Sequence, residues 1–339
     1  MAVTQPAISY GSDKNGLVWG YLFEPGQSPR QIECDEASGF LDDPNARAGA
    51  FVWLHLSLSN AGSERWMRST LRLTEGFYDS LRESVGSTRL ELEDESLVAV
   101  IHDVMFNRTF DSENISTVTL SMTPRLVVSA RLRPLRSVDR LRAAVRAGQT
   151  LRSAAELLAH LLREQAAVLV DIVRQSTARV DTVEDNLLKN RISVSRSELS
   201  ALRRALVRLQ RLLAPEPAAL FRLLNRPPEW LSHDDLEDLR QAAEELSAAT
   251  LDSGALAERL RLLQEELAAL VNEHTNRTLF ILTLVTVLAL PINLVAGLLG
   301  MNVGGIPFST HSQGFLWVVS FLTVVTGTLA YFFLVKRRE

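Results

Sequence analysis

The chain is poor in the residues that build most small redox and metal centres. It has a single cysteine, Cys34, which excludes an internal disulfide and argues against a thiolate zinc site. Its net charge of −4 gives no basic surface of the kind that nucleic acids require, so we expect no nucleic-acid partner. The start, Met1 to Asp13, lacks the basic and apolar regions of a secretory signal, so we expect most of the chain in the cytoplasm.

The most informative absence is that of charge near the C-terminus. No Asp, Glu, Lys or Arg occurs between Arg277 and Lys336, although charged residues make up 22% of the whole chain. Two apolar runs, 278–299 and 315–335, lie in this stretch, and each is long enough for a helix that crosses the roughly 30 Å of a bilayer core. Residues 300–314 between them are rich in Gly and Ser and predict a loop. The sequence therefore predicts two C-terminal transmembrane helices.

The placement of basic residues predicts the orientation of these spans. Arg277 precedes the first span, and Lys336, Arg337 and Arg338 follow the second, whereas the loop has no Lys or Arg. Because cytoplasmic flanks carry the excess of basic residues, we expect both flanks, and so both termini, in the cytoplasm and the loop outside.

The residues before the spans begin with a part that favours a sheet. Runs of β-branched and aromatic residues bounded by turn residues predict strands at 16–24, 50–58, 96–106 and 116–132. Residues 61–73 and 75–85 predict helices. The expected fold class is therefore α+β, with a mixed sheet covered by helices.

Helical periodicity dominates after residue 137. Apolar residues recur at three- and four-residue steps in 165–188 and 195–213, which predicts an antiparallel helix pair whose second member stops near Pro215. Ser232 is then a typical N-cap, and no strong helix breaker follows it before the membrane. We therefore predict one helix from about residue 234 to 299, which must pack against others in this chain or in copies of it.

These patterns divide the chain into seven parts. The first six are bounded by the predicted helices and loops, and the last is the charged end of the chain. The parts are an N-terminal cytosolic α/β domain (1–160), an antiparallel helix pair (161–232), a stalk helix (233–277), a pore-lining transmembrane helix (278–299), an outer loop (300–314), a second transmembrane helix (315–335) and a basic cytosolic tail (336–339).

Polar residues follow one side of the first span. At alternating steps of three and four come Asn276, Leu279, Thr283, Thr286, Leu290, Asn293 and Gly297. This heptad spacing places them on one face of a helix, where polar groups must meet protein or water. Several copies around an axis would turn this face into a pore lining, with Leu279 and Leu290 as apolar constrictions. Alternatively, the Thr and Asn side chains would hydrogen-bond between helices without lining a pore, and the periodicity leaves both possibilities open.

The triplet Gly300-Met301-Asn302, between the two spans, resembles the signature of the CorA family of divalent metal-ion transporters. Within that family, residues 300–307 and the Leu290-Pro291 pair are similar to the ZntB branch of zinc transporters. The resemblance implies a funnel-shaped homopentamer in a bacterial inner membrane. It implies that the first span lines a pore and that a ring of Asn302 side chains engages the hydrated ion at the outer mouth. Zinc uptake is the expected function, with proton coupling left open and a magnesium, cobalt or nickel channel as the alternative.

The outer loop departs from the family because it has no acidic residue. Its His311 is the one candidate for attracting or loosely ligating zinc. In a pentamer, the tail residues Lys336, Arg337 and Arg338 would form a cationic collar around the inner neck. The expected partners are further copies of the chain, the lipid bilayer and divalent metal ions as cargo, and no resident cofactor is expected.

A membrane-anchored enzyme or signalling protein is the competing class. It would require a nucleophile, a phosphate loop or a metal-ligand cluster in residues 1–230, where no GxxxxGK, HExxH or CxxC motif occurs. The acidic group Glu91, Glu93, Asp94 and Glu95 fits either a regulatory metal site or a solvated turn. We therefore expect a transporter and not an enzyme.

Overall fold

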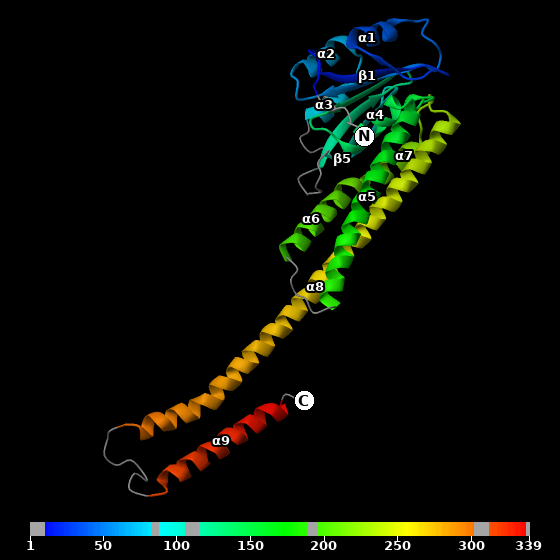
Figure 1. Ribbon diagram of the computed structural model, residues 1–339. Helices are drawn as coiled ribbons and strands as arrows, with labels where there is room; N and C mark the ends of the chain where they lie inside the picture. Colours follow the sequence, from blue (N-terminus) through cyan, green and yellow to red (C-terminus); the bar gives the residue numbers. More distant parts are fainter. Residues whose placement is uncertain (1–10, 83–87, 106–114, 189–195, 302–311, 337–339) are drawn as a thin grey trace, which may run out of the picture. The chain divides into compact units, whose positions relative to one another are not determined.

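The computed structural model describes residues 11–82, 88–105, 115–188, 196–301 and 312–336 (Figure 1). By internal contacts the chain divides into two units, Met1–Leu263 and Gln264–Glu339, and the boundary falls within one long helix.

The first unit begins with a seven-stranded sheet of order β2-β1-β3-β7-β6-β5-β4. Its strands are β1 (Leu17–Phe23), β2 (Arg30–Ile32), β3 (Phe51–Ser57), β4 (Arg89–Glu93), β5 (Ser96–Val104), β6 (Ile115–Met122) and β7 (Leu126–Arg131). The β3–β7 pair is parallel, and the other pairs are antiparallel. The mixed sheet expected from the sequence is therefore confirmed.

Helices cover both faces of this sheet. One face packs its apolar residues against α1 (Cys34–Asp42), α2 (Gly62–Thr70) and α3 (Glu75–Arg82), with Met67 and Phe77 fully buried between them. The other face carries an aromatic layer in which Trp19 stacks on His55 at 4.0 Å, and the guanidinium of Arg142, from α4 (Arg136–Arg146), lies over Trp19. All nine residues of β5 are buried, as expected for a strand with helices on both sides.

The run 116–132, predicted as one strand, is a hairpin of β6 and β7. The Thr123 backbone N–H donates to the carbonyl of Leu126 at 2.8 Å and closes the turn. Pro124 sits in this turn because it has no N–H for a sheet ladder. Prediction of a single strand was therefore wrong.

The rest of the first unit is helical. It contains α5 (Ala154–Leu188), α6 (Arg196–Leu213), α7 (Pro215–Asn225) and the N-terminal part of α8 (His233–Leu299). Pro215 ends the preceding helix as predicted but also begins α7, where the missing N–H of a first-turn proline costs nothing. Ser232 caps α8 reciprocally: its hydroxyl accepts from the Asp235 N–H at 3.2 Å, and Asp235 accepts from the Ser232 N–H at 3.0 Å.

Ion pairs tie α8 to α5 along their length. Arg259 of α8 bonds Asp181 and Glu184 of α5 at 2.7 and 2.5 Å. Nearer the start of α8, Asp238 bonds Arg152 and Arg163 at 2.5 and 3.0 Å. Because most of these side chains are at least partly exposed, the pairs fix the alignment of the helices more than they stabilise them.

The second unit contains the C-terminal part of α8 and the apolar helix α9 (Gly314–Lys336). Both helices are long and apolar enough to cross a membrane. The structure thus has the predicted pair of apolar C-terminal helices after a long helix.

Candidate ion pathway

The seven residues of the polar seam all lie in α8 and are all exposed in the isolated chain. The seam is defined by Asn276, Leu279, Thr283, Thr286, Leu290, Asn293 and Gly297. Its two leucines are 53% and 65% exposed, although the same helix has half-buried apolar residues nearby. This face is therefore left uncovered by the rest of the described chain.

A different face of α8 packs within the second unit. The half-buried positions Phe280, Leu284, Val287, Pro291 and Val295 recur at helical spacing. At 3.6 residues per turn this stripe is centred about a third of a turn from the seam. This stripe is the partly covered face of α8 in the second unit, whose other described helix is α9.

The facing surface of α9 has the same spacing. Val318, Leu322, Val325 and Leu329 are half-buried, whereas Phe315, Trp317 and Phe321 are largely exposed. Apolar exposure of this kind suits a helix in contact with lipid.

The seam contains all the polar side chains between Leu279 and Leu299. The hydroxyl of Thr286 donates to the Leu282 carbonyl at 2.8 Å, so its outward lone pairs remain as acceptors. Neutral oxygens of this kind can replace part of the hydration of a cation and hold it weakly.

The described part of the signature triplet closes α8. The Gly300 N–H donates to the Ala296 carbonyl at 2.9 Å, and a Cβ at this position would lie 2.9 Å from the same oxygen. A larger residue would force the backbone to shift, which explains glycine here. Met301 is 51% exposed.

Several predicted site residues fall outside the described residues. They are Asn302, His311, Arg337 and Arg338. Lys336 is the last residue of α9. The roles assigned to these residues remain predictions.

The acidic group at 91–95 lies in β4 and its turn into β5. Glu91 pairs with Arg89 at 3.1 Å, and Asp94 adopts a left-handed backbone with φ of 48°. No group of three or more His, Cys, Asp or Glu side chains arranged to hold a metal occurs among the residues that the structure describes. The geometry of the described residues favours a solvated turn.

A buried polar cluster that the sequence did not suggest joins β5 to α4, α5 and α7. Glu216 accepts from the His102 backbone N–H at 2.7 Å and from the Gln165 amide at 2.6 Å. Asp103 accepts from the Ser137 N–H at 2.8 Å and from its hydroxyl at 2.6 Å.

Burial dominates the electrostatics of this cluster. It raises the pKa of Asp103 to about 6, against the lowering effect of the Ser137 hydrogen bonds and with a smaller raising effect from the Glu216 charge. Burial likewise raises the pKa of Glu216. The cluster connects β5 to the helices around it. When its carboxylates are charged, their burial lowers the free energy of unfolding.

The fold and the uncovered seam define a class of protein: a sheet domain with a long helix that leads into two membrane-length helices. The chain belongs to the CorA-like Mg2+ transporter protein family, whose family model matches residues 48–338. This confirms the family resemblance of the signature triplet.

Individual relatives cover nearly the whole chain. The chain is 29% identical over 331 residues to the divalent cation transporter CmaX of Pseudomonas aeruginosa, covering 96% of this chain and 97% of the relative. It is 27% identical over 290 residues to the zinc transport protein ZntB of Yersinia enterocolitica, covering 85% of this chain and 88% of the relative.

Solved structures agree on the fold. The full-length CmaX structure matches with a TM-score of 0.80 and 27% identity, covering 97% of this chain and 100% of that chain. The CorA magnesium transporter from Methanocaldococcus jannaschii matches with a TM-score of 0.74, covering 92% of this chain and 96% of that chain; at 17% identity it supports the fold alone.

Proposed function

We propose that the protein is a homopentameric transporter of divalent metal ions, with zinc uptake as its principal activity. The observation that carries this proposal is the uncovered polar seam of α8. A chain with two spans is too small to enclose a water path, so a pore requires several copies with their seams facing one axis.

In this arrangement the hydrated ion passes alternating rings of different chemistry. Rings of Thr283, Thr286 and Asn293 present neutral oxygens, and rings of Leu279 and Leu290 form constrictions that open by wetting. A ring of Asn302 at the outer mouth engages the hydrated ion first, with His311 as the candidate for attracting zinc.

The second span forms the outer, lipid-facing wall of the pentamer. Both termini lie in the cytoplasm of a bacterial cell, with Lys336, Arg337 and Arg338 as a collar at the inner neck. The protein has no enzymatic role and no resident cofactor in this proposal.

Zinc is favoured by the relative named zinc transport protein from Yersinia enterocolitica, which matches 85% of the chain at 27% identity. Magnesium is the second candidate, because the family description names Mg2+ and the CmaX relative is named more broadly as a divalent cation transporter. Between Leu279 and Leu299 the seam has no carboxylate, so proton coupling requires a relay elsewhere.

The test is ion flux into liposomes, measured for Zn²⁺ and Mg²⁺ with and without a pH gradient. We expect zinc flux, and magnesium flux without zinc flux would overturn the zinc assignment. An Asn302→Ala variant that transports normally would remove the role of the outer ring. A monomer by native mass in mild detergent would overturn the pore.

A matched pair of variants tests the seam itself. Thr286→Val removes a seam hydroxyl, and Thr323→Val removes a hydroxyl on α9 that is also exposed and also donates to its i−4 carbonyl at 2.8 Å. We expect Thr286→Val to lower flux about tenfold, as for loss of one or two acceptor contacts in each of five subunits, and Thr323→Val to leave it unchanged. Equal effects would assign both hydroxyls to packing.

A further inference from the structure

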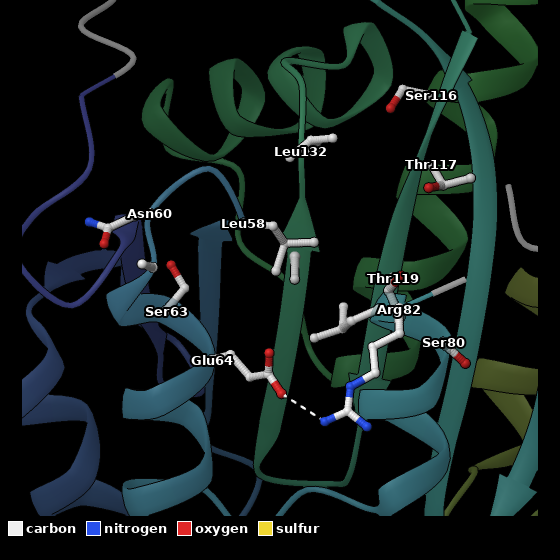
Figure 2. Close-up of a pocket in the computed structure, with 13 residues that line it drawn as sticks. Leu58, Asn60, Ser63, Glu64, Ser80, Arg82, Ser116, Thr117, Thr119 and Leu132 are labelled. Atoms are coloured by element: carbon white, nitrogen blue, oxygen red, sulfur yellow. Dashed lines mark hydrogen bonds and ion pairs between the residues drawn. The ribbon is translucent and has the colours of Figure 1, made fainter. Parts of the chain in front are cut away.

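The first unit has two polar places that the proposed transport function does not use. One is a cavity of about 320 Å³ between β6, α2 and α3, and Figure 2 shows that its charged side chains, Glu64 and Arg82, pair with each other. The other is the buried cluster around Glu216, whose side chain is fully enclosed at 0% exposed. The second place is the more unusual, because a buried carboxylate needs a partner of opposite charge.

The carboxyl of Glu216 receives its hydrogen bonds from neutral groups. Its Oε1 accepts from the His102 backbone N–H at 2.7 Å, and its Oε2 accepts from the Gln165 amide at 2.6 Å. The same amide donates to the His102 carbonyl at 2.5 Å, so both of its hydrogens are used. Among the residues that the structure describes, the one ionisable side chain within ion-pair distance is that of His102, whose Nδ1 lies 3.5 Å from Oε1.

The imidazole of His102 uses one ring nitrogen and leaves the other bare. Nδ1 lies 3.2 Å from the Thr88 hydroxyl, which also lies 3.2 Å from the Leu212 carbonyl. Because a carbonyl can only accept, the hydroxyl donates to Leu212 and accepts from Nδ1. Nε2 is buried and has no partner in the described part of the chain, and the same holds for Gln165 Oε1. Bare acceptors beside a buried carboxylate favour the uptake of a proton.

The other charged groups around Glu216 do not neutralise it. Asp103 lies on the opposite face of β5, where it accepts from Ser137 of α4, and its charge and that of Glu216 repel each other. α5 faces the carboxyl with the uncharged Gln165. β4 and α6 also pack against α7, and the charged side chains described on them are partly or fully exposed: Arg89, Glu91, Glu93, Glu198, Arg203, Arg204, Arg208 and Arg211.

Burial therefore selects the form of the pair that holds one proton. With one proton, the pair is either a neutral acid beside a neutral imidazole or a carboxylate beside an imidazolium, and both forms have no net charge. Without it, the carboxylate is buried with no counter-charge, which lowers the stability of the contact between α7 and β5.

We propose that His102 and Glu216 form a proton-binding site that holds α7 on β5, and that loss of the proton releases α7. Residues 226–232 connect α7 to α8, the helix that carries the seam, and Trp230 among them donates to the Glu95 carbonyl at 3.0 Å. Release of α7 therefore changes how the start of α8 is held. The proton is a regulatory ligand of the sheet domain and does not cross the membrane with the ion.

The sign of the pH dependence follows from the exposed state. Above about pH 6.5 an exposed imidazole is neutral and an exposed carboxyl is charged, so release of α7 frees one proton. The equilibrium constant for release should then rise by about tenfold per pH unit, until the docked pair itself loses its proton.

The test is hydrogen–deuterium exchange of the full chain in detergent, with the protection factors of the α7 amides corrected for the intrinsic exchange rate at each pH. Between about pH 6.5 and 8.5 we expect this protection to fall by at least about tenfold. Protection that stays constant or rises over this range would overturn the proposal.

Two variants assign the effect to the pair. Glu216→Gln keeps an acceptor for the His102 N–H but cannot ionise, so its α7 protection should stay constant over the same range. Glu229→Gln changes an exposed carboxyl between α7 and α8 and should show the fall of the unmodified chain. An equal fall in Glu216→Gln would place the titrating group elsewhere and overturn the assignment. If Glu216→Gln does not fold, the profile of the unmodified chain still decides the proposal.

The effect on transport rests on the proposed function and is measured separately. In liposomes, metal flux should change with the pH on the side of the sheet domain, and Glu216→Gln should remove this change. A chain without any flux would overturn the transport proposal, whereas the exchange profile alone decides the proton site.

Discussion

The buried carboxyl of Asp103 should make the stability of the first unit depend on pH. Burial raises its pKa from 3.8 to about 6. An acid with a raised pKa binds more protons in the folded state than in the unfolded state between these two values. The free energy of unfolding therefore falls as pH rises from about 4 to about 6, and stays lower above that range.

The magnitude follows from the size of the shift. Roughly two pKa units correspond to ~3 kcal/mol. For a unit of this size, 1 kcal/mol moves the melting temperature by about 2–4 °C, so Asp103 should account for roughly 6–12 °C. Charged Glu216 acts in the same direction, because its pKa is also raised by burial.

The assay compares melting temperatures of the unmodified chain and Asp103→Asn in detergent between about pH 3.8 and 8, a range that spans both pKa values. Asn keeps one acceptor for Ser137 but cannot ionise. We expect the difference in melting temperature, unmodified minus variant, to fall by roughly 6–12 °C across the titration. Asp252→Asn, at an exposed position of α8, is the control and should give a flat difference. A flat or rising difference for Asp103→Asn would refute the reasoning, because it would mean that the hydrogen bonds to Asp103 outweigh its burial.

Three further predictions concern single residues of the first unit. Gly20→Ala should destabilise the sheet by about 1–3 kcal/mol in denaturant melts, because a Cβ there would lie 2.8 Å from the Ile32 carbonyl; a neutral result would show that β2 moves freely. Burial raises the pKa of the Cys34 thiol to about 12, so maleimide should label Cys34 at pH 8 only after the chain unfolds. Fast labelling of the folded chain would contradict this. Gly254→Ala should gain up to about 1 kcal/mol of helix stability only in a Gln210→Ala background, since the Gln210 amide lies 2.5 Å from the added Cβ; equal effects in both backgrounds would exclude the contact.

The sequence predicted the elements that have a strong apolar period or a clear cap. Strands β1, β3 and β5 lie within the predicted runs, and α8 begins within one residue of the position that Ser232 indicated. These signals are local, so they survive without tertiary information.

The elements that were not predicted are those whose local signal is weak. β2 has three residues, and β4 alternates charged and apolar residues at the edge of the sheet, where little is buried. Both strands form because they pair by backbone hydrogen bonds with a neighbouring strand, β2 with β1 and β4 with β5. Helix α7 was hidden because prolines were taken only as helix stops.

The buried cluster could not be found from a motif. Glu216 meets His102 across more than a hundred residues of chain. Such sites depend on the order of strands in the sheet, which periodicity does not give.

The sequence left open whether the polar residues of the α8 seam line a pore or hydrogen-bond to another helix, and their exposure in the structure bears on this choice. The polar residues face either water in a pore or another helix that they bind. In the described part of the second unit, the partly covered face of α8 is the stripe through Leu284 and Pro291, whereas the seam is exposed. The described residues therefore favour a partner for the seam other than the chain's own second span. Further copies of the chain would supply either kind of partner, and the proposed ring that turns Thr286 and Asn293 toward a shared axis would also give the neutral oxygens an ion to bind.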